Sequence, residues 1–293
     1  MATNPPYILI TDGGADFPAD FNHSIPIIPF KLINKRDYSE IPTDYDITQI
    51  YKHLTIDQFI AYPLNLTDIT TIFRPYLAKG YDILYLAASA KFIRSYTQAL
   101  VATWTLRKEF PNRRIECVDS RCISGGQALI FMELHKLRDA DTNIDTLISF
   151  VNDNWRKVIH LFSVDNLKYL YRDNRVGFFK YLDSKITGSR PLMHFDSDQT
   201  ISAITTVTSN KQLCEKITNI AERIHLHDGK PVYIHYGNCP SQAYDLRNTL
   251  RDNTSFDIKC DRTLRLGRAI SADLGPTAFG AFFWGKDRDH SLL

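Results

Sequence analysis

The stretch ILITDGGADFP, Ile8–Pro18, joins a short apolar run to a loop that contains two glycines. A short apolar run bounded by turn residues predicts a strand that is buried on both faces of a sheet. The same pattern recurs in YDILYLAA (residues 81–88) and IECVD (residues 115–119), with amphipathic helical stretches between the runs. Strands that alternate with helices need crossover connections, so the first half of the chain predicts a mostly parallel α/β sheet.

The second half of the chain has a different pattern. The run VIHLFSV (residues 158–164) predicts a strand, and PLMHFDSDQTISAITTV (residues 191–207) predicts a hairpin whose turn is DSDQ. We therefore expect two domains, an α/β domain over residues 1–157 and an α+β domain over residues 158–293.

The composition is that of an ordinary globular protein. The 293 residues are 44 % hydrophobic and 23 % charged, and the net charge of +2 gives no reason to expect a nucleic-acid partner. The N-terminal segment lacks the basic and long apolar parts of a signal peptide, and no apolar run is long enough to span a membrane. The five cysteines are scattered and odd in number, so we expect a protein of the reducing cytoplasm.

Small and polar residues follow the three strands predicted in the first half. In an open parallel sheet such residues meet at the edge where ligands bind. They are Thr11, Asp12, Gly13, Gly14, Ser89, Ala90, Lys91, Asp119 and Ser120. This pattern fits a site that holds an oxygen-bearing head group through hydroxyls and backbone N–H groups, but the same residue types serve turns and helix caps. Both interpretations stay open.

The sequence contains no familiar enzyme motif. It lacks the glycine-rich nucleotide loops, the nucleophile elbow of hydrolases, the zinc-protease motif and a CxxC pair. Asp12 and Asp119 could together hold a metal or a proton, or each could cap the helix that follows its strand. The HLH stretch (residues 225–227) favours a solvated or helix-capping pair over a metal site, and His235 favours a core histidine. We expect no catalytic residue, no metal and no cofactor.

Six segments in order along the chain together resemble the DegV family. They are ILITDGGADFP, ECVDSRCISGGQALI, LFSVDNLKYLYRDNRVG, SRPLMHFDSDQTI, YIHYGNCPSQAYDLRNTL and LGRAISADLGPTAFG. The first is similar to the family's T-D-S-x-A-D-L-P and the last to its I-G-x-x-I-G-x-H-x-G-P-G-A-x-G. Each motif is weak alone, whereas six in register over nearly the whole chain are specific.

The resemblance implies a two-domain fold with a ligand cleft or tunnel between the domains. A long-chain fatty acid would lie with its acyl chain in an apolar tunnel and its carboxylate near the interdomain cleft. The binder would be a carrier without a catalytic nucleophile, and some members present the acid to a separate fatty acid kinase. The ligand-binding positions expected in this chain are Thr11, Asp12, Tyr62, Leu64, Ser89, Ala90, Arg94, Ser95, Arg175 and Asp273.

The chain departs from the family pattern at the expected head-group positions. Gly13 replaces the serine of T-D-S, residues 61–64 read AYPL where the family has S-Q-P-[ST], and Arg94 replaces a small residue of S-S-x-L-S-G-T. Arg175 survives from G-G-R-I without the glycines, and Asp273 stands in place of the histidine that precedes G-P-G.

Asp273 poses a problem of charge, because a carboxylate beside a ligand carboxylate is unfavourable. Either the two share a proton, or Arg175, Lys91 or Arg94 neutralises one of them, or the ligand is not an anion. We hypothesise that Arg94 pairs with Asp273 or with the anionic group of the ligand. The alternative is that Asp273 caps the turn at residues 275–276.

Three functions remain open at this point. The first is a carrier of a fatty acid or a related lipid. The second is a binding protein for a small ligand with a neutral or cationic head group. The third is a hydrolase or phosphotransferase that uses Asp12 and Asp119.

Overall fold

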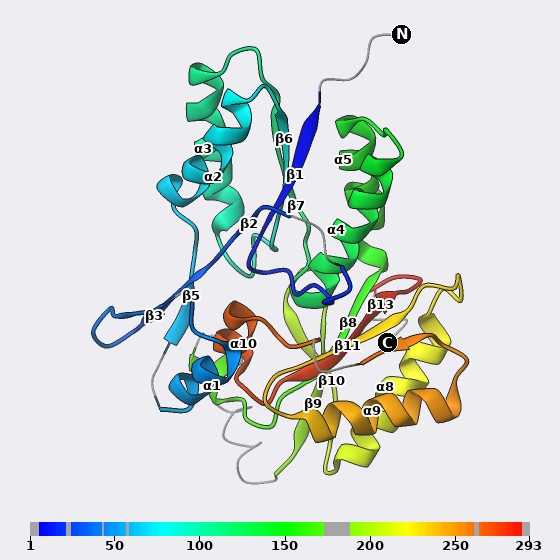
Figure 1. Ribbon diagram of the computed structural model, residues 1–293. Coiled ribbons are helices and arrows are strands. Elements are labelled where there is room, and N and C mark those ends of the chain that lie inside the picture. Colours follow the sequence, from blue (N-terminus) through cyan, green and yellow to red (C-terminus); the bar gives the residue numbers. More distant parts are fainter. Residues whose placement is uncertain are drawn as a thin grey trace.

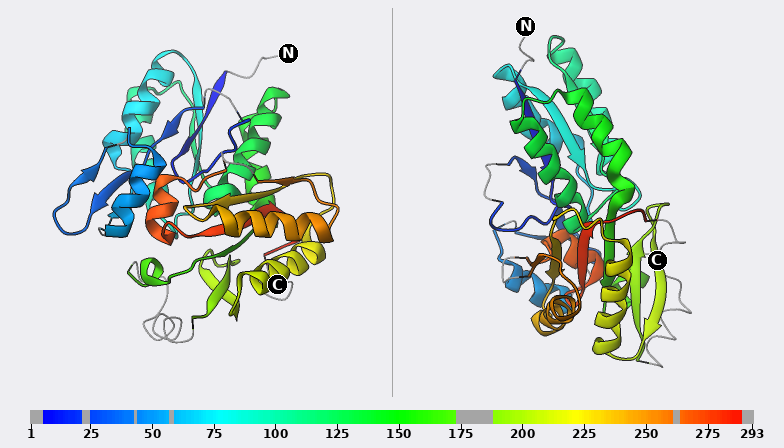
Figure 2. Two further views of the ribbon diagram at one scale, coloured as in Figure 1. Left: turned by 60° about the horizontal axis from the view of Figure 1, so that its bottom comes forward. Right: turned by 90° about the vertical axis from the view of Figure 1, so that its right-hand side faces the viewer.

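The computed structural model describes residues 6–21, 25–42, 44–56, 59–172, 188–260 and 264–288. These residues form two large sheets and one small sheet, surrounded by helices (Figures 1 and 2). The mixed α/β fold class predicted from the sequence is confirmed.

The first sheet is parallel. Its four strands, in spatial order, are β2 (Ile27–Ile28), β1 (Tyr7–Asp12), β6 (Asp82–Ala87) and β7 (Ile115–Asp119). Figure 1 shows helices on both of its faces, with α2 and α3 on one side and α4 and α5 on the other. Side chains alternate accordingly, since Ile10 belongs to the core under α2 and α3 while Leu9 packs with α4 and α5.

The helices of this region are α2 (Leu66–Ala78), α3 (Ser95–Glu109), α4 (Ser124–Asp139) and α5 (Ile144–Asn154). The first turn of α2 is capped by side chains. Asn65 is the N-cap: its side chain accepts a hydrogen bond from the Asp68 backbone N–H, and the Asp68 carboxylate accepts one from that of Asn65. This reciprocal capping box fixes the first turn.

The second sheet has six strands. Their spatial order is β10 (Ile201–Val207), β9 (Arg190–Phe195), β8 (Val158–Ser163), β13 (Phe279–Trp284), β11 (Val232–Tyr236) and β12 (Ile258–Lys259). The predicted hairpin is confirmed, since β9 and β10 pair antiparallel with Phe195 opposite Ile201. The helices α8 (Asn210–Ile224) and α9 (Pro240–Asn253) cover one face, and α4 packs against β8 and β13.

A small antiparallel sheet lies beside these layers, in a part of the chain to which the sequence analysis assigned no element. It consists of β4 (Glu40–Ile41), β3 (Lys31–Asn34) and β5 (Phe59–Tyr62), and it packs with α1 (Ile47–Ile56). Near the other end of the chain, the short helix α10 (Arg268–Leu274) packs against β5, β3 and α1. Figure 1 shows α10 beside α1 and β5, so segments far apart in the sequence meet here.

The remaining elements connect the layers. A 3₁₀ turn, η1 (Trp155–Lys157), leads into β8, and α6 (Lys168–Arg172) packs against α10. A division between residues 157 and 158 would place one large sheet in each domain. The helix α10 of the second domain would then pack on the small sheet of the first. This division stays a prediction. None of the helices that the structure describes is long and apolar enough to cross a membrane.

Candidate ligand-binding site

Asp12 is the centre of a buried polar network at the end of β1. Its Oδ1 atom accepts hydrogen bonds from the Gly14 backbone N–H and from Gln127 Nε2, both at 3.0 Å. Its Oδ2 atom accepts from the Tyr85 hydroxyl at 2.6 Å and from the Ala88 backbone N–H at 3.0 Å. Burial raises the pKa of Asp12, and these four donors oppose that shift. Asp12 therefore braces β1, β6 and α4, and the prediction that it caps a following helix is wrong.

Thr11 takes part in the same network. Its hydroxyl donates to the Leu86 carbonyl oxygen at 2.8 Å and accepts from Gln127 Nε2 at 3.0 Å. The Thr11 and Asp12 side chains are both inaccessible to solvent. Their hydrogen-bonding capacity is used within the protein. We conclude that they support the edge of the four-stranded sheet at which β1, β6 and β7 end, which we call the rim.

Asp119 holds the backbone of two loops at the end of β7. Its Oδ1 atom accepts hydrogen bonds from the Ala90 backbone N–H at 3.3 Å and from the Arg121 backbone N–H at 2.8 Å. The residue before α4 is Ile123, so the expectation that Asp119 caps that helix is also wrong. Burial raises the pKa of Asp119. Among the described residues, no group of three or more His, Cys, Asp or Glu side chains could hold a metal ion.

The loop after β6 contacts the turn of the β9–β10 hairpin. The Ser89 hydroxyl, which is fully buried, donates to Gln199 Oε1 at 3.1 Å. Lys91 is exposed, and its Nζ atom donates to the Asp198 carbonyl oxygen at 2.6 Å. These two bonds join the rim of the four-stranded sheet to the six-stranded sheet.

Ser95 provides a second buried hydroxyl at the start of α3. Its Oγ atom accepts a hydrogen bond from the Leu64 backbone N–H at 3.1 Å, and its own O–H remains a donor. The Leu64 side chain is buried, whereas Tyr62, the last residue of β5, is 51 % exposed. The structure therefore brings Leu64 to Ser95 and leaves the Tyr62 side chain largely in solvent.

One continuous apolar cluster lies against both serines. Phe92 and Ile93, which separate Ser89 from Ser95 in the chain, belong to it. The cluster draws its other members from both large sheets, from α2 and α10 and from the loops beside them, including Ile10, Phe30, Leu64, Phe73, Phe162, Met193, Phe195, Leu266, Ile270 and Leu274. An apolar region bordered by two hydroxyls offers the chemistry that an amphipathic ligand with an oxygen-bearing head group requires.

The predicted ion pair between Arg94 and Asp273 is not formed among the residues that the structure describes. Arg94 is exposed immediately before α3, while Asp273 is only 5 % exposed within α10. For a long cationic side chain, the free energy of hydration at the surface is more favourable than that of a single buried ion pair. Arg175 lies outside the described residues.

Sequence reasoning overlooked four polar residues of this region. Tyr85 and Gln127 support Asp12, Gln199 contacts Ser89, and Asp16 accepts hydrogen bonds from the Ser124 hydroxyl at 2.6 Å and from the Gly267 backbone N–H at 2.9 Å. Tyr85 and Gln127 carry a usable signal, because each is a polar side chain within an otherwise apolar run. Gln199 and Asp16 lie in turns and carry none.

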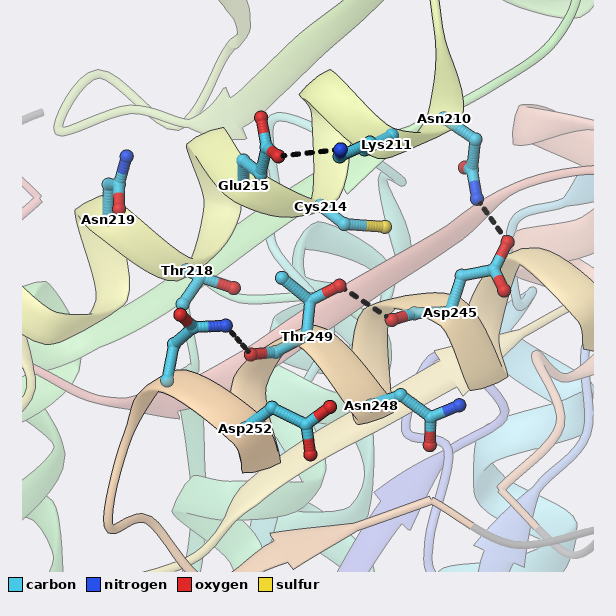
Figure 3. Close-up of a pocket in the computed structure, with 11 residues that line it drawn as sticks. Asn210, Lys211, Cys214, Glu215, Thr218, Asn219, Asp245, Asn248, Thr249 and Asp252 are labelled. Atoms are coloured by element: carbon cyan, nitrogen blue, oxygen red, sulfur yellow. Dashed lines mark hydrogen bonds and ion pairs between the residues drawn. The ribbon is translucent and has the colours of Figure 1, made fainter.

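Two other polar regions lie away from this rim. A cavity of about 630 Å³ opens between α8 and α9 (Figure 3).

The histidines that precede β11 are structural: His225 is buried, and the His227 ring contacts the Glu222 carbonyl oxygen at 3.3 Å near the end of α8. This arrangement agrees with the expected capping role of the HLH stretch.

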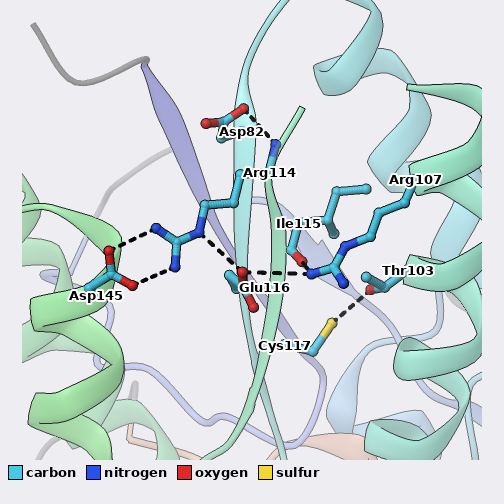
Figure 4. Close-up of polar contacts among 8 residues, drawn as sticks. All are labelled: Asp82, Thr103, Arg107, Arg114, Ile115, Glu116, Cys117 and Asp145. Carbon is cyan, nitrogen blue, oxygen red and sulfur yellow. Dashed lines mark hydrogen bonds and ion pairs between the residues drawn. The ribbon is translucent and has the colours of Figure 1, made fainter. Parts of the chain in front are cut away.

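A cluster of ion pairs lies at the opposite end of β7, where the strand begins (Figure 4). Arg114 donates to both carboxylate oxygens of Asp145 in α5, at 2.9 and 2.6 Å, and to Glu116 at 3.1 Å. Its backbone N–H donates to Asp82 at 2.9 Å. This end of a parallel sheet is not where ligands bind, and we assign the cluster a structural role.

The fold and the rim define a class: a two-sheet α/β protein with a candidate small-ligand site between its sheets. Residues 7–286 match the family described as "uncharacterised protein, DegV family". The chain belongs to the DegV family, as the sequence motifs predicted.

Similar proteins cover nearly the whole chain. A DegV domain-containing protein of Clostridium perfringens is 23 % identical over 294 residues, which are 97 % of this chain and 99 % of the relative. The crystal structure of a stearic-acid-binding protein from Eubacterium ventriosum has a TM-score of 0.83 at 17 % identity and covers 98 % of this chain and 100 % of its own. The Streptococcus pneumoniae fatty acid kinase (Fak) B3 protein, loaded with linoleic acid, has a TM-score of 0.79 at 15 % identity and covers 96 % and 100 %.

Proposed function

We propose that this protein binds a long-chain fatty acid as a non-catalytic carrier. The observation that carries the proposal is the position of two buried hydroxyls, Ser89 and Ser95, at the border of an apolar cluster that both large sheets share. The carboxyl group would accept hydrogen bonds at this rim, and the acyl chain would lie among the apolar side chains. Fatty acids in proteins of the same fold, from Eubacterium ventriosum and Streptococcus pneumoniae, support this assignment.

Gln199 suggests how the head group would enter. The Ser89 hydroxyl donates to an amide oxygen of Gln199, and a carboxylate oxygen accepts the same kind of hydrogen bond. In the proposal, the ligand carboxyl group replaces Gln199 as the acceptor. The bond from Lys91 to the Asp198 carbonyl oxygen would keep the hairpin turn close to the rim during this exchange.

Catalysis by Asp12 and Asp119 is not part of the proposal. All the hydrogen bonds of Asp12 are to groups within the fold, and Asp119 holds two backbone amides. We propose instead that the carrier presents its acid to a fatty acid kinase, as the description of the pneumococcal protein suggests. Because a kinase needs a nucleoside triphosphate, we place this carrier in the cytoplasm.

A second candidate function rests on Asp273. This carboxylate is buried beside the apolar cluster, to which its neighbour Leu274 belongs. Asp273 already interacts with another group of the protein, and a neutral or cationic head group could approach it without the like-charge repulsion that a fatty-acid carboxylate would meet. A binding protein for such a ligand is therefore the alternative.

The first experiment is denaturing extraction of the freshly purified protein followed by mass spectrometry. A stoichiometric fatty acid would support the carrier. The second candidate function would be favoured instead by the absence of lipid together with an unchanged melting temperature across a panel of fatty acids.

A pair of serine variants tests the site itself. In displacement of a fluorescent fatty acid, Ser89→Ala should weaken binding about tenfold, because one hydrogen bond to a charged group is lost. The matched control is Ser120→Ala, which removes a buried hydroxyl that bonds only locally, to the backbone of Cys122. Equal affinities of the two variants would contradict the placement of the head group at Ser89.

A further inference from the structure

The groove between α8 and α9 is a polar cavity that the proposed fatty-acid site does not use. Its volume is about 630 Å³, within the range of small-molecule sites. Figure 3 shows Thr218 and Cys214 of α8 and Thr249 of α9 in the gap between the two helices. The lining residues are Asn210, Lys211, Cys214, Glu215, Thr218, Asn219, Asp245, Asn248, Thr249, Asp252 and Asn253.

The floor and the rim of the groove differ in polarity. Thr218 and Cys214 form the floor and are 2 % and 1 % exposed. The carboxylates of Glu215, Asp245 and Asp252 stand at the exposed rim. A ligand in the groove would therefore meet hydrogen-bonding groups below it and negative charge around it.

Two polar atoms of the lining are buried and have no hydrogen-bond partner among the residues that the structure describes. One is the hydroxyl of Thr218, which points from α8 into the gap in front of α9 (Figure 3). The other is Oδ1 of Asn210, whose Nδ2 atom donates to Asp245 Oδ2 at 2.7 Å. A buried polar atom without a partner destabilises a fold unless something else satisfies it. Both atoms can accept a hydrogen bond, and the Asn210 oxygen can do nothing else.

The charge balance of the lining is negative. Its three carboxylates face a single ammonium group, that of Lys211, which lies 4.0 Å from Glu215. Both members of this pair are exposed to solvent, so the pair offsets little of the negative charge of the lining. The described residues offer no cluster of three or more His, Cys, Asp or Glu suited to a metal ion, which leaves an organic cation as the fitting charge.

We propose that this groove binds a small organic amine that carries more than one ammonium group. An ammonium group donates up to three hydrogen bonds and accepts none, which complements a lining rich in acceptors. A ligand with several such groups can reach the unpartnered Thr218 and Asn210 atoms and the rim carboxylates at once. The volume is many times that of a single bound water and suits a short linear polyamine.

Isothermal titration calorimetry of the full chain with spermidine tests the proposal. We expect saturable one-to-one binding that weakens as salt is added, because the attraction is electrostatic. The neutral diol 1,4-butanediol, which can form hydrogen bonds but carries no charge, should give no saturable binding. Absence of saturable binding by spermidine, or equal binding by the diol, would overturn the proposal.

Two charge variants should move the affinity in opposite directions. Asp245→Asn keeps the side-chain shape and should weaken spermidine binding about fivefold, whereas Lys211→Met removes the competing ammonium group and should strengthen it about twofold. The matched controls are Asp153→Asn on α5 and Lys216→Met on α8, which remove the same charges outside the lining. If each variant behaves like its control, the proposal fails. Should Asp245→Asn not fold, as a melting curve would reveal, the exposed Lys211 and Lys216 pair decides alone.

Discussion

Asp12 is the last residue of β1 and Asp16 lies in the loop that follows; both carboxylates are buried, but their surroundings differ. Asp12 accepts four hydrogen bonds, from Tyr85 in β6, from the Ala88 backbone N–H directly after β6, from Gln127 in α4 and from the Gly14 backbone N–H in the loop after β1. Asp16 accepts two, one from Ser124 at the start of α4 and one from the Gly267 backbone N–H before α10. The donors to Asp12 all come from the four-stranded sheet, its loops and α4, whereas Asp16 connects the start of α4 to the segment before α10, near the other end of the chain.

The comparison separates the scaffold from the contacts that can change. Asp12 has four donors that oppose the effect of burial, although burial still raises its pKa. Asp16 has fewer donors, and burial raises its pKa to about 7. Three contacts between distant segments can therefore be changed by a small perturbation. A proton would act at Asp16, a ligand at the bond between Ser89 and Gln199, and a single methyl group at the contact of Gly275 with Tyr169.

The largest change in the free energy of unfolding is expected at Asp12, whose carboxylate accepts four hydrogen bonds. Asp12→Ala leaves the donors of Tyr85, Gln127 and the two backbone amides without their acceptor in a buried site, and it should lower the free energy of unfolding by about 4 kcal/mol. Urea denaturation measures this change. Asp153→Ala, an exposed substitution on α5, is the control and should stay within about 0.5 kcal/mol of the wild type. A loss below about 1 kcal/mol for Asp12→Ala would mean that the network does not support the sheet.

The strands that surround this network could be predicted from the sequence, but its connections could not. Residues 7–12, 82–87 and 115–119 form apolar runs, and such runs have few alternatives to a buried strand. The role of Asp12 depends on Tyr85 and Gln127, which are 73 and 115 positions away. No local sequence pattern reveals partners that far away. The sequence could therefore identify the polar residues as candidates for a ligand site, but it could not show which of them support the sheet and which of them line the site.

The small sheet and α10 show a second limit of sequence reasoning. The strands β3, β4 and β5 have two to four residues each, too few for an alternating pattern to stand out. The helix α10 has seven residues and is stabilised by packing against β5, β3 and α1. Such elements depend on partners elsewhere in the chain, and Asp273, which α10 carries, could be placed only once those partners were known.

Gly275 offers a smaller effect at a contact between distant segments. Its φ of +91° disfavours any side chain, and a Cβ atom there would also meet the ring of Tyr169 in α6. Gly275→Ala should therefore lower the free energy of unfolding by about 3 kcal/mol. Gly80→Ala is the matched control, since its φ is +88° and its Cβ would find open space. The control should cost about 1 kcal/mol, and equal losses in the two variants would show that the contact with Tyr169 contributes nothing.

The smallest effect concerns Asp16 and depends on pH. Its pKa of about 7 in the folded protein exceeds the usual value of 3.8, so the folded protein holds the proton more tightly than the unfolded chain. Stability from this group is therefore complete below about pH 4 and falls as the pH rises towards the folded pKa. Asp16→Asn cannot ionise and keeps an oxygen for the Gly267 N–H, so it removes this dependence.

Urea denaturation of both proteins across this range measures the difference. Between about pH 5 and about pH 7 the wild type should lose about 2 kcal/mol relative to Asp16→Asn. Asp12, Asp119 and the other titrating groups are common to the two proteins, so their contributions cancel in the difference. A difference that stays constant over the range would mean that Asp16 is ionised in the folded protein, and that its two hydrogen bonds offset the cost of its burial.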